Sequence, residues 1–183
     1  MAVTYFGNND DGAGQNPFNA SWTWFLVVGY TCPGTGLQNL ITLDININTV
    51  DTGNIRMAIY DTVGNFIAQW DDQYTPGGTG WFAKTSFVDE GEAPINPQLT
   101  GGVNYILAAT QDGAGSTHSI KYDTVGENTV KYVTSDYTEG FPDPIVISSP
   151  ASDREFCFRA GVEPAAAGGS IVPILLSTRM RKS

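Results

Sequence analysis

The sequence predicts an all-β protein built as an antiparallel β-sandwich with an extended C-terminal arm. Its 21 glycines and 10 prolines divide 183 residues into short segments. Several of these segments alternate apolar and polar residues with a period of two, as half-buried strands do. No window keeps the 3.6-residue period of a helix without a glycine or proline inside it. A hydrophobic share of 41% excludes a disordered chain, and the length favours one domain.

A β-hairpin over residues 55–70 is the strongest local prediction. Two runs rich in β-branched and aromatic residues flank Asp61–Asn65, and Gly64 in this connection tolerates the positive φ that such a turn needs. A two-stranded ribbon is only marginally stable alone, so we expect it to pack against a second layer. The side chains predicted to face that layer are Ile55, Met57, Ile59, Phe66, Ala68 and Trp70.

The other strands follow from the same reading of the chain. Residues 7–21 are almost all turn formers and predict an irregular loop, whereas residues 22–30 are apolar on both faces and predict a central strand. Further strands are expected at 81–88, 103–110, 119–122, 129–134, 145–148 and 155–159.

The cleanest alternation lies in residues 41–48. Isoleucine and leucine occupy every second position and predict one face buried in the core. The polar residues between them predict a face open to water, and these are Thr42, Asp44, Asn46 and Asn48.

The charge is strongly negative and unevenly distributed. The formal net charge is −10 and the sequence pI is about 4.2, which disfavours binding to the phosphates of nucleic acids. Arg179, Arg181 and Lys182 lie within the last five positions, so the rest of the chain carries −13. A cationic end on an anionic body predicts contact with an acidic neighbour, including another copy of the chain.

Residues 163–183 differ from the rest and predict a domain boundary at residue 162. They form a linker rich in alanine and glycine, then an apolar run interrupted by Pro173, then the basic end. The apolar run of six residues is far shorter than the ~20 that a membrane span needs. We expect this C-terminal arm to pack on its own or a neighbouring subunit, through Ile171, Val172, Ile174, Leu175, Leu176, Arg179, Arg181 and Lys182.

Two cysteines, Cys32 and Cys157, are too few for a disulfide framework. We expect two partly buried free thiols, with a Cys32–Cys157 disulfide as the alternative. The first seven residues lack the basic start and apolar core of a signal peptide. Either a signal has been removed or the protein uses none, as expected of virion parts assembled in the cytoplasm.

Residues 37–110 carry a resemblance to a known class of module. The alternating strand is followed by Ile55–Asp61, a Gly-Asn turn, the pair Gly80-Trp81 and the segment Leu99–Ala108. This order resembles jelly-roll β-sandwich modules of bacterial surface proteins, secreted glycan-degrading enzymes and phage structural proteins. The resemblance implies a jelly-roll fold, and it implies glycan binding, calcium binding or particle building as the kinds of function to consider.

The residues do not predict an enzyme. His118 is the single histidine, so a cluster of histidines around a metal is impossible, and no Gly-x-Ser-x-Gly sequence supplies a nucleophile. We expect His118 to be an ordinary polar residue of a strand or loop. A glycosidase would need two carboxylates across a sugar, and the acidic residues near aromatics are Asp71, Asp72, Asp89, Glu90 and Glu92.

Two kinds of binding site remain candidates. Glycan binding requires exposed aromatic faces beside carboxylates, and residues 70–81 offer both. The candidates there are Trp70, Tyr74, Trp81, Asp71 and Asp72, although Trp70 and Trp81 suit a core equally well. Structural calcium could use the loop carboxylates of Asp10 and Asp11, although no EF-hand spacing is present.

These features together predict a non-enzymatic structural protein. It would associate with itself or decorate the exterior of a multi-subunit particle, namely a phage virion, as a decoration, head-fibre or tail component. Its partners would be copies of itself, capsid or tail proteins, or both, with a glycan as a further candidate and without nucleic acid or a membrane span. The alternative is a carbohydrate-binding module of a bacterial surface or secreted protein, located outside the cell.

Overall fold

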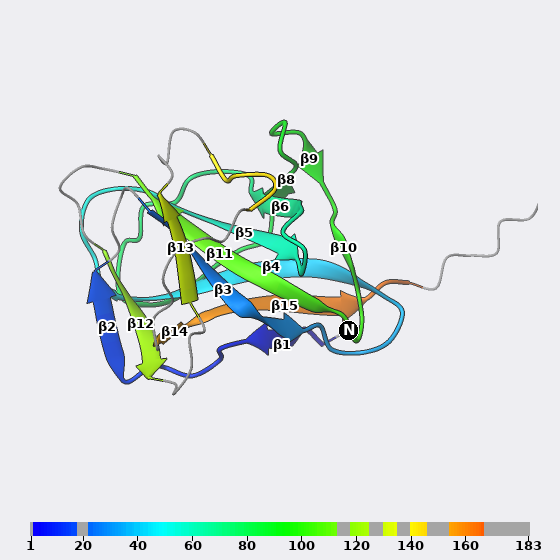
Figure 1. Cartoon of the computed structure of the whole chain (residues 1–183), viewed down its shortest axis with the longest axis horizontal. Helices are drawn as coiled ribbons and strands as arrows, with labels where there is room; N and C mark the ends of the chain where they lie inside the picture. The colour runs from blue at the N-terminus through cyan, green and yellow to red at the C-terminus, as the bar shows by residue number, and fades with distance from the viewer. Residues whose placement is uncertain are drawn as a thin grey trace, which may run out of the picture.

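The computed structural model describes residues 2–17, 22–112, 118–124, 130–134, 140–145 and 154–166, and in these residues it shows two antiparallel β-sheets packed face to face (Figure 1). In chain order the strands are β1 (Thr4–Gly7), β2 (Gly14–Pro17), β3 (Trp22–Thr31), β4 (Leu37–Thr49), β5 (Ile55–Asp61), β6 (Phe66–Trp70), β7 (Gly80–Lys84), β8 (Phe87–Val88), β9 (Pro94–Ile95), β10 (Gln98–Thr100), β11 (Asn104–Gln111), β12 (Ser119–Thr124), β13 (Val130–Thr134), β14 (Arg154–Phe156) and β15 (Phe158–Pro164).

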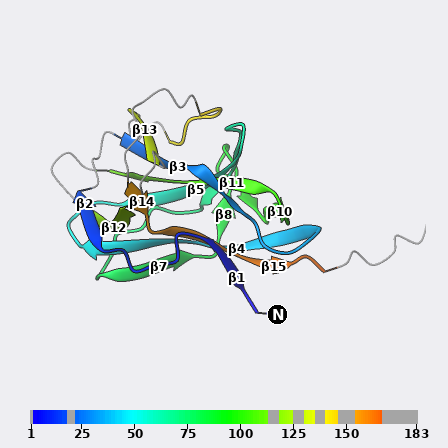
Figure 2. The ribbon, with the colours of Figure 1, turned by 60° about the horizontal axis from the view of Figure 1, so that its bottom comes forward.

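The predicted all-β sandwich is confirmed. Sheet A has the order β1-β15-β4-β12-β14, with β2 paired to β12 and both β7 and β10 paired to β4. Sheet B has the order β13-β3-β11-β5-β6-β8-β9. The strand expected at 22–30 is internal, because β3 lies between β13 and β11. Figure 2 shows the two layers from the side. The more specific resemblance to jelly-roll modules stays a prediction.

The core lies between the two sheets and is made from the period-2 faces of their strands. Sheet A contributes Leu43, Ile45 and Ile47 from β4, while β5 of sheet B contributes its alternating apolar residues. Each such side chain removed from water stabilises the fold by roughly 1.5–3 kcal/mol. The indole Nε1–H of Trp70 on β6 donates to the carbonyl oxygen of Leu43 at 3.1 Å, so one core side chain links sheet B to sheet A.

The hairpin β5–β6 forms as predicted, and its turn explains the Asp61–Asn65 sequence. The carboxylate of Asp61 accepts hydrogen bonds from the backbone amides of Val63 at 3.0 Å and Asn65 at 2.9 Å. Gly64 has φ of +94°, and a Cβ there would lie 3.1 Å from the carbonyl oxygen of Ile145. This position therefore needs glycine both for its conformation and for the close contact.

The predicted direction of Phe66 is wrong. The register between β5 and β6 shifts between the pair Ile59–Ala68 and the pair Tyr60–Phe66. This irregularity turns Phe66 away from the core, and its ring meets Tyr60 edge-on at a centroid distance of 5.6 Å. Phe66 instead packs against a second hydrophobic cluster on the outer face of sheet B.

The strand expected at 81–88 is two strands in different sheets. Residues of β7 pair with β4 in sheet A, whereas β8 pairs with β6 in sheet B. The chain crosses the sandwich at Thr85 and Ser86, which belong to neither strand. Phe82 and Phe87 are five residues apart and would point to opposite faces of one continuous strand, whereas the crossing lets both face the core from opposite sheets.

The expected N-terminal loop contains a strand. β2, within residues 7–21, pairs with β12 although its sequence is rich in turn formers. Glycine at position 14 permits this pairing, because β2 passes so close to β12 that a Cβ on Gly14 would lie 2.4 Å from the ring of Tyr122. Asp123 holds the preceding loop by accepting hydrogen bonds from the Asn8 side chain at 3.0 Å and the Ala13 backbone at 3.1 Å. Tertiary contacts here override local propensity.

The domain boundary expected at residue 162 falls inside a strand. β15 continues to Pro164 in register with Gln38, and the backbone amide of Ala165 donates to the carbonyl oxygen of Leu37 at 3.0 Å. The sandwich therefore includes residues 163–166. The arm residues Ile171, Val172, Ile174, Leu175, Leu176, Arg179, Arg181 and Lys182 lie outside the described residues, as do 146–148 of the strand expected at 145–148.

Both cysteines are free and fully buried, so the expectation of free thiols is confirmed and they are more deeply buried than predicted. Burial raises the pKa of the Cys157 thiol to about 12, and the nearby Asp123 carboxylate adds to the shift. A thiol with so high a pKa holds little thiolate, so Cys157 is a poor nucleophile at neutral pH.

Candidate functional site

The outer face of sheet A is not the water-exposed surface that the alternation on β4 predicts. Asp44 is 1% exposed and Asn46 is 0% exposed, although both lie on the polar face. The N-terminal residues cover part of this face: a Cβ on Gly161 would lie 2.6 Å from the Thr42 hydroxyl and 2.7 Å from Val3. Because these covering residues are distant in sequence, the period-2 pattern of β4 carries no sign of them.

The centre of this covered face is an arginine held between two aromatic rings. The guanidinium carbon of Arg159 lies 4.0 Å from the ring centroid of Trp81 and 4.3 Å from that of Tyr5. Nε of Arg159 also donates to a carboxylate oxygen of Asp44 at 2.8 Å. The three strands β1, β15 and β7 are thereby joined across β4 by one side chain. We call Tyr5, Arg159, Trp81 and Asp44 the arginine stack.

Burial controls the charge state of the acidic member of the stack. Removal of Asp44 from water raises the pKa of its carboxyl group above the ordinary value of 3.8. The hydrogen bond from Arg159, the neighbouring Thr42 hydroxyl and the positive charge of Arg159 act in the opposite direction without cancelling the shift. The stack is thus a buried ion pair whose desolvation is incompletely offset.

This raised pKa predicts a pH-dependent contribution to stability. A carboxyl group whose pKa is higher in the folded state contributes stability that is fully present below its unfolded pKa and is lost as the pH rises through its folded pKa. Relative to the variant Asp44→Asn, the wild-type protein should therefore be more stable at about pH 4 than at about pH 7. Urea unfolding of both proteins at each pH measures the difference. A difference that stays constant with pH would contradict the assignment.

The aromatic residues predicted to form a glycan platform do not lie on one surface. Trp70 is 1% exposed and belongs to the core, so it offers no face to a sugar. Tyr74 packs edge-on against Trp70 at 6.4 Å and beside Phe82 at 5.4 Å, on the inner side of β7. Trp81 is opposite Asn46 in the β4–β7 register and therefore points to the outer face.

The acidic residues of that platform lie at the surface, unlike Trp70. Asp71 and Asp72 are exposed, and Asp72 lies 3.9 Å from the ammonium group of Lys84. Three rings in different environments cannot stack on one sugar, so this combination of residues is not a site. Alternation along β7 sends Trp81 to the outer face and Phe82, which packs beside Tyr74, to the inner face.

His118 fixes the turn between β4 and β5 and is fully buried. Its Nδ1 accepts a hydrogen bond from the backbone amide of Asp51 at 3.0 Å, and its Nε2 lies 3.0 Å from the carbonyl oxygen of Gly53. These partners are satisfied together when Nε2 carries the proton and donates it. Both ring nitrogens are therefore occupied by backbone groups.

The proposed calcium ligands Asp10 and Asp11 are exposed in the loop before β2. Within the described ranges, no group of three or more histidine, cysteine, aspartate or glutamate side chains could hold a metal ion. Structural calcium stays a prediction.

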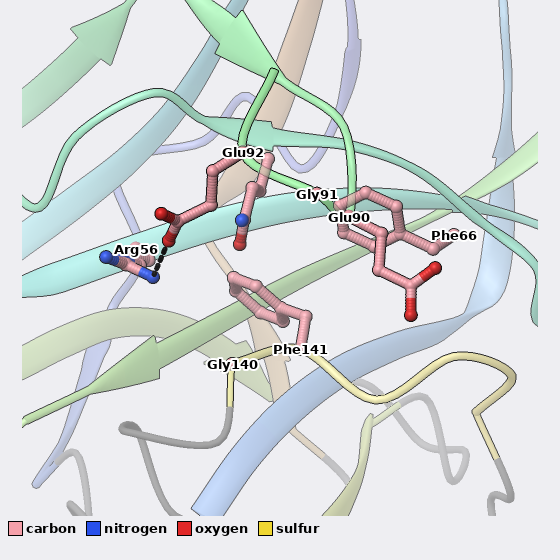
Figure 3. Close-up of a pocket in the computed structure, with 8 residues that line it drawn as sticks. Arg56, Phe66, Glu90, Gly91, Glu92, Gly140 and Phe141 are labelled. Atoms are coloured by element: carbon pink, nitrogen blue, oxygen red, sulfur yellow. Dashed lines mark ion pairs between the residues drawn. The ribbon is translucent and has the colours of Figure 1, made fainter.

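A polar pocket of about 340 Å³ lies on the outer face of sheet B (Figure 3). Its lining comes from β5, β6, the turn between β8 and β9, and the segment 140–145, and consists of Arg56, Phe66, Gln69, Glu90, Gly91, Glu92, Gly140 and Phe141. We call this the sheet-B pocket. It was not predicted as a binding site, although Glu90 and Glu92 appear among the acidic residues considered for catalysis.

The segment 140–145 is fastened to the hairpin and forms one wall of the pocket. The Tyr60 hydroxyl donates to the carbonyl oxygen of Pro142 at 3.0 Å, and the Phe66 backbone amide donates to the Asp143 carboxylate at 3.0 Å. The ring of Phe141 packs against Tyr60 at a centroid distance of 6.5 Å. These contacts hold Phe141 in place, and Figure 3 shows its ring projecting toward the turn that carries Glu90 and Glu92.

The opposite wall is a tight turn that aims a carboxylate at an arginine. The backbone carbonyl oxygen of Asp89 accepts a hydrogen bond from the amide of Glu92 at 3.0 Å. The side-chain carboxylate of Asp89 accepts one from the amide of Ala93 at 2.9 Å. Glu92 adopts φ of +60°, an uncommon conformation for a residue with a side chain. In this position its carboxylate lies 3.9 Å from the guanidinium of Arg56 (Figure 3).

Gln69 is the buried polar residue of the pocket. It is 6% exposed, lies opposite Ala58 in the register of the hairpin, and its Oε1 has no hydrogen-bond partner among the described residues. A buried amide oxygen without a partner is unfavourable by about 1–3 kcal/mol, and such groups are uncommon in folded proteins. In the described structure, the sheet-B pocket therefore combines a cavity with a buried polar atom that has no hydrogen-bond partner.

Comparison with protein-family models, curated sequences and solved structures found no match to this chain. Among the described residues, no helix is long and apolar enough to cross a membrane.

Proposed function

We propose that the protein is a non-enzymatic structural component that associates with itself or with neighbouring subunits on the exterior of a multi-subunit particle, namely a phage virion. In this proposal the β-sandwich is a rigid structural domain, and the C-terminal arm attaches it to a neighbouring subunit. The support from the sequence is the order of the arm, an apolar run followed by a basic end, on a body with an excess of acidic residues.

The structural observation that supports this proposal is the placement of β15, the strand that leads into the arm. β15 is paired on both sides, with β1 and with β4, and its ladder to β4 extends to Pro164. The hydrogen bonds of an antiparallel ladder run perpendicular to the strands, so a pull along β15 is resisted by two ladders at once. The arm thus starts from a firmly held strand.

The test compares the mass of the full chain with that of a variant whose apolar run carries charges. In Ile174→Asp/Leu176→Asp we expect loss of association, because buried apolar contacts would be replaced by carboxylates that need water. Sedimentation velocity should show an oligomer for the wild-type protein and a monomer of 19.6 kDa for the variant.

The matched control is Val63→Asp, which adds a carboxylate at a residue that is 76% exposed in the β5–β6 turn. Its association should equal that of the wild-type protein. A chain ending at Ala166 keeps β15 complete and provides a second comparison. A wild-type protein that sediments as a monomer at all concentrations would remove the proposal of self-association.

A second candidate function is carbohydrate binding by a module of a bacterial surface or secreted protein. The observation that favours it is the sheet-B pocket, in which charged and amide side chains lie beside the rings of Phe66 and Phe141. This arrangement of polar groups beside apolar ring faces is the general chemistry of sugar recognition. The site differs from the Trp70, Tyr74 and Trp81 combination that the sequence suggests.

A further inference from the structure

We infer that the sheet-B pocket binds a neutral saccharide unit, with Gln69, Arg56 and Glu92 as hydrogen-bonding groups and Phe66 and Phe141 as apolar walls. The inference rests on the second candidate function and is independent of self-association. It names both the ligand class and the residues that would contact it.

The dimensions of the pocket suit one small ligand. Its volume of about 340 Å³ is at the lower end of the range in which small-molecule sites fall. The walls are built before any ligand arrives, because the hairpin holds the segment 140–145 through Tyr60, Phe66 and Gly64. A site that needs no folding on binding avoids the cost of ordering its own chain.

The charges of the pocket favour a neutral ligand over an anion. Among the described residues that line it, the charged groups are the carboxylates of Glu90 and Glu92 and the guanidinium of Arg56. Glu92 lies 3.9 Å from that guanidinium, so a phosphate or carboxylate ligand would have to compete with a resident acid for it. The body of the chain is itself acidic and would repel such an ion at longer range.

Gln69 distinguishes a hydroxyl-bearing ligand from a cation. Its buried Oε1 lacks a donor among the described residues, and rotation about the terminal bond of the side chain exchanges the amide oxygen with the amide nitrogen. A ligand hydroxyl group can donate to the amide oxygen of Gln69 or accept from its amide nitrogen, whereas an ammonium group can only donate. The apolar C–H face of a sugar ring would lie against the phenyl groups of Phe66 or Phe141, which line the same space.

The experiment uses the full chain and the methyl glycosides of glucose, galactose and mannose, with methylammonium as the cationic probe. Saturation-transfer NMR detects binding, and titration gives the dissociation constant. We expect at least one glycoside to bind in the millimolar range or more tightly. Gln69→Leu should weaken that binding by roughly tenfold or more. Leucine is similar in shape to glutamine but cannot form a hydrogen bond to the ligand.

The stability of the same variant separates a binding role from a structural one. Because Oε1 of Gln69 has no hydrogen-bond partner in the part of the chain that the structure describes, Gln69→Leu should unfold at the same temperature as the wild-type protein or higher. A purely structural glutamine would give a lower melting temperature. The control Gln98→Leu makes the same chemical change at an exposed position of β10 and should leave binding unaltered.

Three results would overturn the inference: binding of methylammonium without binding of any glycoside, no binding of any probe, or glycoside binding that survives Gln69→Leu at full strength. The sedimentation behaviour of Gln69→Leu should match that of the wild-type protein. Failure of the saccharide site and failure of self-association are thereby measured separately.

Discussion

Replacing Arg159 with methionine is expected to lower the free energy of unfolding by about 3 kcal/mol, because breaking a buried ion pair leaves the other charge without compensation. Asp44 is 1% exposed, and Arg159 supplies the hydrogen bond to its carboxylate at 2.8 Å. Methionine retains an unbranched side chain between Tyr5 and Trp81 but offers neither charge nor donor. Urea unfolding measured by tryptophan fluorescence gives the change.

The second site of the pair provides the control for this experiment. Asp44→Asn in the Arg159→Met background removes the stranded charge, so the double variant should recover part of the lost stability. Arg159→Lys keeps the positive charge but loses the planar group that stacks on both rings, and an intermediate loss is expected. A loss below about 1 kcal/mol for Arg159→Met would mean that the pair behaves like an exposed salt bridge, and the arginine stack would have no structural importance.

The period-2 pattern was sufficient to predict most strands but insufficient to predict what lies outside the sheets. Ile55, Met57 and Ile59 are buried as expected, because alternation decides which face of a strand meets the core. Asp44 and Asn46 are buried against expectation, since their cover comes from β1 and β7. Burial of a second face depends on long-range pairing, which a local pattern does not encode.

Irregular registers caused the other errors in side-chain direction. The shift between Gly161 and Val162 places Leu40 opposite Val162 and leaves Ile41 without a partner in the ladder with β15. Ile41 is consequently half-buried, while Leu40 enters the core. Phe66 changes face for the same reason in the hairpin. One extra residue in a strand puts the side chains on its two sides out of step with a simple alternation.

The sequence predicts the part of the sheet-B pocket that the hairpin forms, but not the part that loops form. The predicted hairpin places Arg56 and Gln69 on the face opposite Met57 and Trp70, so their common surface could have been inferred from the alternation. The other half comes from Glu92 and Phe141, which loops bring from distant parts of the chain. The positions of these loops depend on tertiary contacts such as the hydrogen bond from Tyr60 to Pro142. A short sequence motif does not predict such contacts.

Replacing Trp70 with alanine is expected to lower the free energy of unfolding by about 4 kcal/mol, because a large side chain leaves a cavity in a close-packed core. Trp70 is 1% exposed, and its indole joins sheet B to the Leu43 carbonyl oxygen of sheet A. The variant loses both the packed volume and this hydrogen bond. Thermal unfolding followed by circular dichroism should show a strongly lowered melting temperature.

Two further variants separate volume from hydrogen bonding and test the assignment of the two tryptophans. Trp70→Phe keeps most of the ring but leaves the Leu43 oxygen without its donor, so about 1–3 kcal/mol should be lost. Trp81→Phe should cost less, because Trp81 is only half-buried on the outer face and phenylalanine still offers a ring to Arg159. The sequence treats these tryptophans as equivalent candidates for core or ligand platform. A larger loss for Trp81→Phe than for Trp70→Phe would contradict the placement of Trp70 as the link between the sheets.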